Sequence, residues 1–377
     1  MGDFNESGKL DLALTDALGV LILPGNGDGT FQQPVNFLLT DTGGRAFPGA
    51  ILAGDFNGDG EPDIAVGMPL SATSSVAVLL GNGNGTFQPT AYYSVANANS
   101  LAVGDFNGDG KPDLVAVGSS FSTSHVSILL GNGGGAFQPA ISFAVGGPDA
   151  SAVAVGDFNG DGNADLVIVN RGGGSVSLLL GNGNGTFQPA VNYTVGSVPS
   201  AVAVGDFNGD GKPDLAVTNH ASGTVSILLG KGDGTFQPAV NYAVEQWPSA
   251  VAAADFNADG KLDLAVANLH SGSGSVLIGN GDGTFRPAVR YGLRGGPESV
   301  AVGDFNGDGK PDLVFANDSS SASILLGNGD GTFRPQEIFL LQGNPSSVAV
   351  GNFSGDGKLD IVGVSYNDVS VLTNTTP

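Results

Sequence analysis

The sequence predicts an all-β fold, a β-propeller of four-stranded antiparallel blades, with eight blades expected and seven as the alternative. Two observations predict it. One nine-residue phrase, seen in its fullest form as DFNGDGKPD at 206–214, recurs every 48 to 52 residues. Each repeat also contains four short β-prone runs that end at Gly, Asn, Pro or Ser. A fixed period of this length indicates a repeat architecture, and four strands per repeat are typical of a propeller blade.

The period runs from end to end, so we expect a single domain over residues 1–377. The first repeat starts inside its first strand and the last stops after a third strand near 369–373, so both terminal blades should be incomplete. A start that lacks upstream residues would account for both gaps. Seven blades would result if the terminal repeats did not both enter the ring. The repeats are approximately 1–49, 50–99, 100–150, 151–199, 200–248, 249–297, 298–345 and 346–377.

Residues 200–248 illustrate the elements of one repeat. The expected strands are roughly 200–207, 214–219, 224–230 and 239–244. The first alternates Ala and Val, which suits an inner strand crowded against a central axis. Runs that are apolar on both faces indicate sheets covered on both sides, as in radially stacked blades. A β-solenoid coil with three hairpins in about 50 residues is harder to build, so the propeller is favoured.

A second phrase, GNGxGTF, lies between the third and fourth strands. Its Asn-Gly and Asp-Gly steps tolerate the positive φ that a tight hairpin needs. Its fourth position varies freely among Asp, Asn and Gly, which indicates a turn rather than a metal site. Of the 21 phenylalanines, 15 either follow the first residue of the nine-residue phrase or end this turn, which predicts that they pack between blades.

The amino-acid composition limits the classes of partner that the protein is expected to bind. The net charge is −23 with only 13 Lys and Arg, so neither nucleic acid nor membrane insertion is expected. There is no Cys, which excludes disulfides and thiol chemistry. No run of 18 apolar residues occurs, and the first residues show no signal-peptide pattern. We expect a monomer.

The nine-residue phrase predicts a metal site. In each intact copy, oxygen-bearing side chains occupy positions 1, 3, 5 and 9, position 6 is Gly, and the main-chain carbonyl of position 7 is a further ligand. An all-oxygen set favours Ca²⁺ over Mg²⁺ and, without His or Cys, disfavours zinc. We expect about six Ca²⁺ sites. The residues at position 7 would contribute their backbone carbonyls: Glu61, Lys111, Asn163, Lys212, Lys261 and Lys310. The side-chain ligands would be Asp55, Asn57, Asp59, Asp63, Asp105, Asn107, Asp109, Asp113, Asp157, Asn159, Asp161, Asp165, Asp206, Asn208, Asp210, Asp214, Asp255, Asn257, Asp259, Asp263, Asp304, Asn306, Asp308 and Asp312.

The competing interpretation is an EF-hand, whose loop requires a bidentate Glu at position 12. Position 12 is apolar in all six copies: Val66, Ala116, Ile168, Val217, Val266 and Phe315. The sequence therefore predicts a loop that closes at position 9 and runs into a strand. The terminal copies keep fewer carboxylates and should bind weakly or not at all, through Asp3, Asn5 and Asp11 in the first and Asp356 and Asp360 in the last.

At these residues the chain resembles the FG-GAP and VCBS repeat family, which includes the integrin α-subunit head propeller and many secreted bacterial propellers. The resemblance covers 3–373, and the pattern DxNxDGxxD followed by an apolar strand is its most specific element. It implies that the loop joins the first two strands of a blade and holds calcium. It also implies an extracellular or cell-envelope location.

Two functions remain open. The first is a non-catalytic, lectin-like binding or adhesion module for a carbohydrate or protein ligand. The alternative is a polysaccharide-active, lyase-like enzyme, because some such enzymes share this architecture. No Ser-His-Asp or paired-carboxylate set stands apart from the calcium loops, so a non-enzyme is favoured. Candidate ligand-binding residues are Trp247, His220 and His270, and the other residues that break the repeat are His125, Arg45, Arg171, Arg290 and Arg294.

Overall fold

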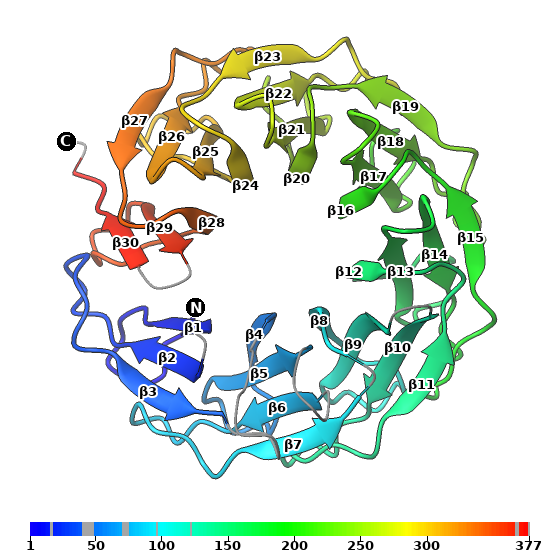
Figure 1. Ribbon diagram of the computed structural model, residues 1–377, viewed down its shortest axis with the longest axis vertical. Helices are drawn as coiled ribbons and strands as arrows, with labels where there is room; N and C mark the ends of the chain where they lie inside the picture. Colours follow the sequence, from blue (N-terminus) through cyan, green and yellow to red (C-terminus); the bar gives the residue numbers. More distant parts are fainter. Residues whose placement is uncertain are drawn as a thin grey trace. The chain divides into compact units, whose positions relative to one another are not determined.

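The computed structural model describes residues 1–15, 18–39, 49–69, 75–95, 97–120, 123–365 and 369–375. Every regular element within these ranges is a β-strand, and the strands form eight antiparallel sheets (Figure 1). The predictions of an all-β propeller and of eight blades are both confirmed. No helix in this part of the chain has the length and hydrophobicity needed to span a membrane. The chain divides into two compact units, 1–192 and 193–377, which we describe separately.

The first unit begins with a three-stranded sheet, and its other sheets have four strands each. The three strands of the first sheet are β1 (Leu12–Thr15), β2 (Gly19–Leu23) and β3 (Val35–Leu38). The following sheets are β4 (Ile51–Gly54), β5 (Asp63–Met68), β6 (Ser75–Leu79) and β7 (Ala91–Ser94); β8 (Ser100–Gly104), β9 (Asp113–Ser120), β10 (Thr123–Leu129) and β11 (Ile141–Ala144); and β12 (Ala150–Gly156), β13 (Asp165–Asn170), β14 (Ser175–Leu179) and β15 (Val191–Thr194), inside which the boundary between the units falls.

The second unit ends with a three-stranded sheet. Its four-stranded sheets are β16 (Pro199–Gly205), β17 (Asp214–Asn219), β18 (Thr224–Leu228) and β19 (Val240–Ala243); β20 (Pro248–Ala254), β21 (Asp263–Asn268), β22 (Ser273–Leu277) and β23 (Val289–Gly292); and β24 (Pro297–Gly303), β25 (Asp312–Asn317), β26 (Ser321–Leu325) and β27 (Glu337–Leu340). The last sheet is β28 (Pro345–Gly351), β29 (Asp360–Ser365) and β30 (Val369–Leu372).

Burial follows the order of the strands within each complete blade. All residues of the second strand β17 are buried, and so are nearly all of the third strand β18, because these strands are apolar on both faces and lie between other strands. The first strands β16, β20, β24 and β28 contact one another in succession, as expected of inner strands. The fourth strand β19 is largely exposed.

Phenylalanines pack between consecutive sheets, as predicted. The ring of Phe56, in the loop after β4, lies 6.0 Å from that of Phe137, in the turn of the next sheet. Tyr93 on β7 meets Phe137 edge-on at 5.5 Å. The GNGxGTF turns have the expected positive φ, 76° at Gly281 and 82° at Gly283. In that turn Thr284 donates its backbone N–H to Asp282 Oδ1 at 3.0 Å, so the fourth position serves the turn.

Candidate functional site

The carboxylate at position 9 of each loop is buried and anchors the loop to its own blade. Asp113, the first residue of β9, is fully buried. Its Oδ2 accepts a hydrogen bond from the backbone N–H of Phe106 at 2.8 Å. Its Oδ1 accepts one from Gly131, the first residue of the GNGGGAF turn, at 2.7 Å. The same pair of bonds is made by Asp63, Asp165, Asp214, Asp263 and Asp312, and by Asp11 of the first copy.

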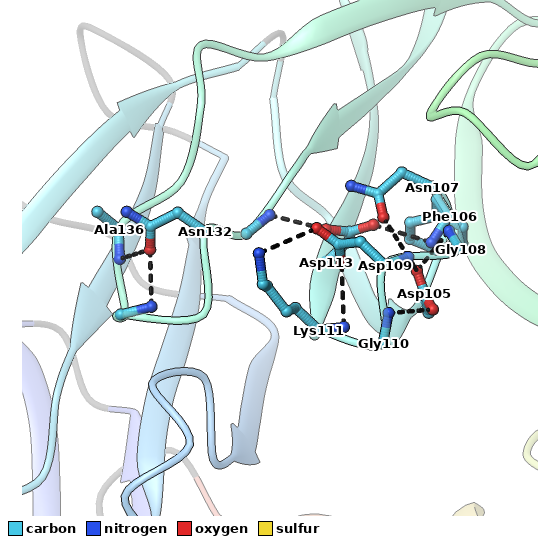
Figure 2. Close-up of polar contacts among 12 residues, drawn as sticks. Asp105, Phe106, Asn107, Gly108, Asp109, Gly110, Lys111, Asp113, Asn132 and Ala136 are labelled. Carbon is cyan, nitrogen blue, oxygen red and sulfur yellow. Dashed lines mark hydrogen bonds and ion pairs between the residues drawn. The ribbon is translucent and has the colours of Figure 1, made fainter.

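The other oxygen-bearing side chains shape the loop from within (Figure 2). Asp105 accepts hydrogen bonds from Gly108 N–H at 2.7 Å and from Gly110 N–H at 2.8 Å, one on each carboxylate oxygen. Asn107 Oδ1 accepts from Asp109 N–H at 2.9 Å, and Asp109 Oδ1 accepts from Lys111 N–H at 3.0 Å. These bonds turn the chain back on itself, and the positive φ of 75° at Gly110 allows the reversal.

Charge is concentrated in this loop. Lys111 Nζ lies 3.3 Å from Asp109 Oδ2, and Lys212, Lys261 and Lys310 pair in the same way with position 5 of their own loops. Burial raises the pKa of the Asp113 carboxyl; the bonds from Gly131 and Phe106 oppose this rise, and repulsion by Asp109 and Asp105 adds to it. In these four loops the lysine therefore offsets only part of the negative charge of the loop, and the loops with Glu61 and Asn163 at position 7 have no lysine there.

The donor chemistry of the loop fits a hard cation. Positions 1, 3, 5 and 9 supply only carboxylate and amide oxygens, the donor atoms that calcium takes in proteins. Within the described ranges, no three His, Cys, Asp or Glu side chains are gathered closely enough to hold an ion. The side chains turn instead toward backbone N–H groups, so the Ca²⁺ ligands stay a prediction that rests on donor type.

The two terminal copies differ from the six intact ones. In the first, Asp3 accepts from Ser7 N–H at 2.9 Å and from Gly8 N–H at 2.6 Å, so the loop closes although position 5 carries no carboxylate. In the last, Asp360 accepts from both Phe353 and Ser354, and Asn352 Oδ1 is buried without a hydrogen-bond partner. Weak metal binding by these copies remains a prediction.

The three candidate ligand-binding residues form one cluster in the second unit. Trp247, just before β20, has its ring 5.0 Å from the ring of His220 in a stacked arrangement. His270, after β21, lies 4.5 Å from the Trp247 ring on a tilted plane. Trp247 is 44% exposed and has a φ of 57°, in the left-handed region that a bulky residue rarely adopts. The histidines of two neighbouring blades thus meet at the tryptophan between them.

An open cavity of about 490 Å³ adjoins this cluster. Trp247, His270 and Ser271 line it, together with Glu298 and Asp318. Burial raises the pKa of Glu298, and repulsion by Asp318 raises it further. Asp318 Oδ1 accepts a hydrogen bond from Gly296 N–H at 2.7 Å.

These two carboxylates correct the expectation that no acidic pair stands apart from the calcium loops. Glu298 occupies the position that Ser200 and Ser249 hold in the two preceding blades, and Asp318 follows Asn317 as His220 follows Asn219. The signal was present as two breaks in the repeat. The sequence did not show that these two residues line one cavity.

None of the other repeat-breaking residues that the structure describes lines this cavity. Arg290, on β23, is 3.7 Å from Glu245 and also donates to the carbonyl of Ser271 at 3.1 Å. Arg294 accepts with its carbonyl from Ser319 Oγ at 2.7 Å. His125 is part of β10, and Arg171 donates its N–H to the Asp149 carbonyl at 2.9 Å. Arg45 lies outside the described residues.

Solved structures share this fold. The chain is similar to an Agrocybe aegerita lectin with specific recognition of non-reducing terminal N-acetylglucosamine (20% identity over 98% of this chain and 96% of that one, TM-score 0.59). It is also similar to the periplasmic gluconolactonase of Pseudomonas aeruginosa (13%, 97% and 99%, TM-score 0.61) and to the V. cholerae biofilm matrix protein Bap1 (15%, 100% and 86%, TM-score 0.57). At these identities the likeness concerns the fold alone.

No curated protein matches the chain in sequence. The model of the FG-GAP-like repeat matches it seven times, at residues 3–66, 55–116, 105–168, 157–217, 206–266, 255–315 and 304–363. Each match begins at the first residue of one loop and runs through the next loop into the strand that follows it. Taken together, these matches span most of the sequence, and the chain belongs to the FG-GAP-like repeat family.

Proposed function

We propose that the chain is a calcium-stabilised, non-catalytic binding module that acts outside the cell or in its envelope and holds a carbohydrate in the cavity beside Trp247. One observation carries the proposal: the aromatic and acidic residues that break the repeat converge on one open cavity. Binding sites typically combine such apolar rings with a few polar groups that fix orientation. A sugar presents both C–H faces and hydroxyl groups, and this cavity offers partners for both.

The ring contacts limit how Trp247 can take part. His220 stacks on its indole, so a sugar would meet the remaining exposed part of the indole and the imidazole of His270, which lines the cavity. Glu298 and Asp318 would accept hydrogen bonds from sugar hydroxyls. The Agrocybe aegerita lectin, whose fold is similar, supports carbohydrate as the ligand class.

Calcium enters the proposal through the six intact loops. The residues at positions 1, 3, 5 and 9, with the carbonyl of position 7, would hold the ion, which would supply the positive charge that these loops need. Its role here is to tie the loop together. An adhesive role is in keeping with this binding function, and the Vibrio cholerae biofilm matrix protein has a similar fold.

Glycan-array binding in calcium tests the proposal. Trp247→Ala should weaken binding by about tenfold or more, as expected when an aromatic anchor is truncated. His270→Ala should weaken it as well, and His220→Ala less, because His220 acts only through Trp247. Val198→Ala is the matched control, since Val198 holds the same position in the preceding blade with a φ of 56°. Glycan binding that survives all three changes would contradict the proposed site.

The acidic pair favours a second candidate, a polysaccharide-active enzyme. A carboxyl with a raised pKa beside a second carboxylate is the arrangement from which glycosidases draw a general acid and its partner. Glu298, whose pKa is raised, would be the acid. Release of new chain ends from a polysaccharide, abolished by Glu298→Gln, would establish catalysis, whereas binding without any cleavage favours the module.

A further inference from the structure

The cavity beside Trp247 opens where the blade of β24 to β27 departs from the repeat. Val198 and Trp247 each precede the proline that begins a first strand, and Gly296 holds this position before β24. The carbonyl of Trp247 accepts from the N–H of Leu269 at 2.9 Å, and the carbonyl of Gly296 accepts from Asp318 in the same way at 2.8 Å. The positions are therefore equivalent in structure, and Gly296 lines the cavity at the point where the preceding blades carry a large side chain.

Two glycines form one wall of this cavity, and neither can be replaced without a shift of its neighbours. A Cβ atom on Gly296 would overlap the carbonyl oxygen of Leu269, and one on Gly295 would overlap the side chain of Ser319. The N–H of Gly296 donates to Asp318 Oδ1 at 2.7 Å. This bond fixes the Asp318 carboxylate against the glycine wall, so the carboxylate is oriented before a ligand binds.

The charge in the cavity is negative and uncompensated. Glu298 and Asp318 line it, and among the described residues its wall contains no Lys or Arg. Arg290 contacts Glu245 at 3.7 Å and donates to the carbonyl of Ser271 at 3.1 Å instead. Burial raises the pKa of Glu298, and repulsion by Asp318 raises it further. A cation between the two carboxylates would relieve this repulsion, whereas an anion would add to it.

We propose that the carbohydrate site described above, on which this assignment rests, selects a sugar with a free amino group and binds its ammonium between Glu298 and Asp318. A de-N-acetylated hexosamine is such a sugar. An ammonium group has three N–H donors, and its hydrogen bonds to carboxylates are about twice as strong as neutral ones. The ring of the sugar lies against the part of the Trp247 indole that is exposed.

Other ligands match this cavity less well. Uronic acids and sulfated sugars would bring negative charge to two carboxylates. Neutral sugars donate hydroxyl hydrogens but leave the charge uncompensated. An N-acetylated amino sugar offers one neutral N–H and turns a carbonyl oxygen toward acidic groups. A lysine side chain carries the same ammonium group, but a cavity of about 490 Å³ is wider than its narrow stem needs.

A matched pair of tetrasaccharides tests the assignment. Isothermal titration calorimetry of the full chain in calcium compares tetraglucosamine with tetra-N-acetylglucosamine, at a pH at which the amines are protonated. Tetraglucosamine should bind at least about tenfold more tightly, because the ammonium makes charge-assisted hydrogen bonds. This preference should shrink between about 0.1 M and about 1 M NaCl, since the Debye length falls from about 10 Å to about 3 Å.

Charge-removing variants locate the ammonium. Glu298→Gln and Asp318→Asn keep the shape of each side chain, and Asp318→Asn keeps an oxygen that can accept the N–H of Gly296. Each variant should reduce the preference for the amino sugar several-fold, and the double variant should abolish it. Glu337→Gln removes the same charge from an exposed residue of β27 and is the matched control, which should keep the preference.

Equal affinity for the two tetrasaccharides would overturn the ammonium site and leave the carbohydrate site standing. A preference that the double variant leaves unchanged would do the same. If neither these tetrasaccharides nor any glycan on the array binds, the carbohydrate site fails as well. Tighter binding of a lysine-containing peptide than of tetraglucosamine would assign the two carboxylates to a polypeptide ligand instead.

Discussion

The N–H of Gly131 donates to Asp113 Oδ1 at 2.7 Å, which joins the calcium-type loop of a blade to the turn beyond the third strand of the same blade. The other oxygen of Asp113 holds Phe106, the residue that packs against the next blade. One buried carboxylate therefore fixes three segments.

Asp214→Ala should lower the free energy of unfolding by about 3 kcal/mol, measured by urea denaturation in excess chelator. The change leaves the N–H groups of Phe207 and Gly230 buried without an acceptor, and each such loss costs about 1–3 kcal/mol. Asp210→Ala, in the exposed part of the same loop, is the control and should have a much smaller effect without metal. Equal losses in the two variants would refute a special role for position 9.

Removal of calcium should lower the unfolding midpoint, and added calcium should restore it. With dissociation constants of roughly 10⁻⁴ to 10⁻³ M, each site adds about 1.4 kcal/mol at tenfold saturation, or about 8 kcal/mol for six sites. Thermal denaturation with and without EGTA measures the effect, and magnesium should restore much less. An unchanged midpoint in excess chelator would rule out a structural role for calcium.

Asn219→Asp should destabilise the second unit by about 3–5 kcal/mol, the usual cost of an uncompensated buried charge. Asn219 is fully buried, and its Nδ2 donates to Ser226 Oγ at 2.8 Å. Ser226 in turn donates to Asn241 Oδ1 at 2.6 Å, so it has no proton left for a carboxylate in place of the amide. Asn241→Asp, at the exposed end of this chain of bonds, is the matched control and should be tolerated. Denaturation midpoints of both variants decide the matter.

Glu298→Gln should remove a pH dependence of stability. Because the folded pKa of Glu298 is raised above its ordinary 4.5, the folded state holds this proton more tightly than the unfolded state does. The contribution of the protonated Glu298 carboxyl to stability is therefore fully present below pH 4.5 and is lost as the pH rises through the raised pKa of the folded state. The variant should be more stable than the wild type above this window. Urea midpoints across the window, compared with Ser249→Ala as a control, test the sign.

The repeat made most of the fold predictable. The strand of residues 214–219 is apolar on both faces and follows a loop with fixed spacing, so its position and burial could be read directly from the sequence. Equal positions in successive repeats also placed His220 and His270 in neighbouring blades. In a periodic sequence the pattern for each local structure occurs several times, so short β-prone runs can be assigned as strands with less ambiguity.

Two features could not be predicted from the residues. Asp113 reads as a metal ligand, and only the structure shows both of its oxygens bonded to backbone N–H groups. Glu298 and Asp318 directly follow Pro297 and Asn317, which pair across β24 and β25, but only the structure shows that both side chains line one cavity. Both features depend on contacts between segments, which periodicity does not specify.

The contact between Phe256 and the turn at Gly331 and Phe333 gives the array a direction, because Phe4, Phe106 and Phe207 contact the turn of the following blade in the same way. The recurring structural unit is thus the contact between two consecutive blades rather than the blade itself. The free energy of unfolding should then depend strongly on the contacts between neighbouring blades, as it does in other repeat proteins. A mutation in one loop would first destabilise the blade that follows it. Adding or deleting a whole repeat would preserve the type of contact between blades and change only the number of these contacts.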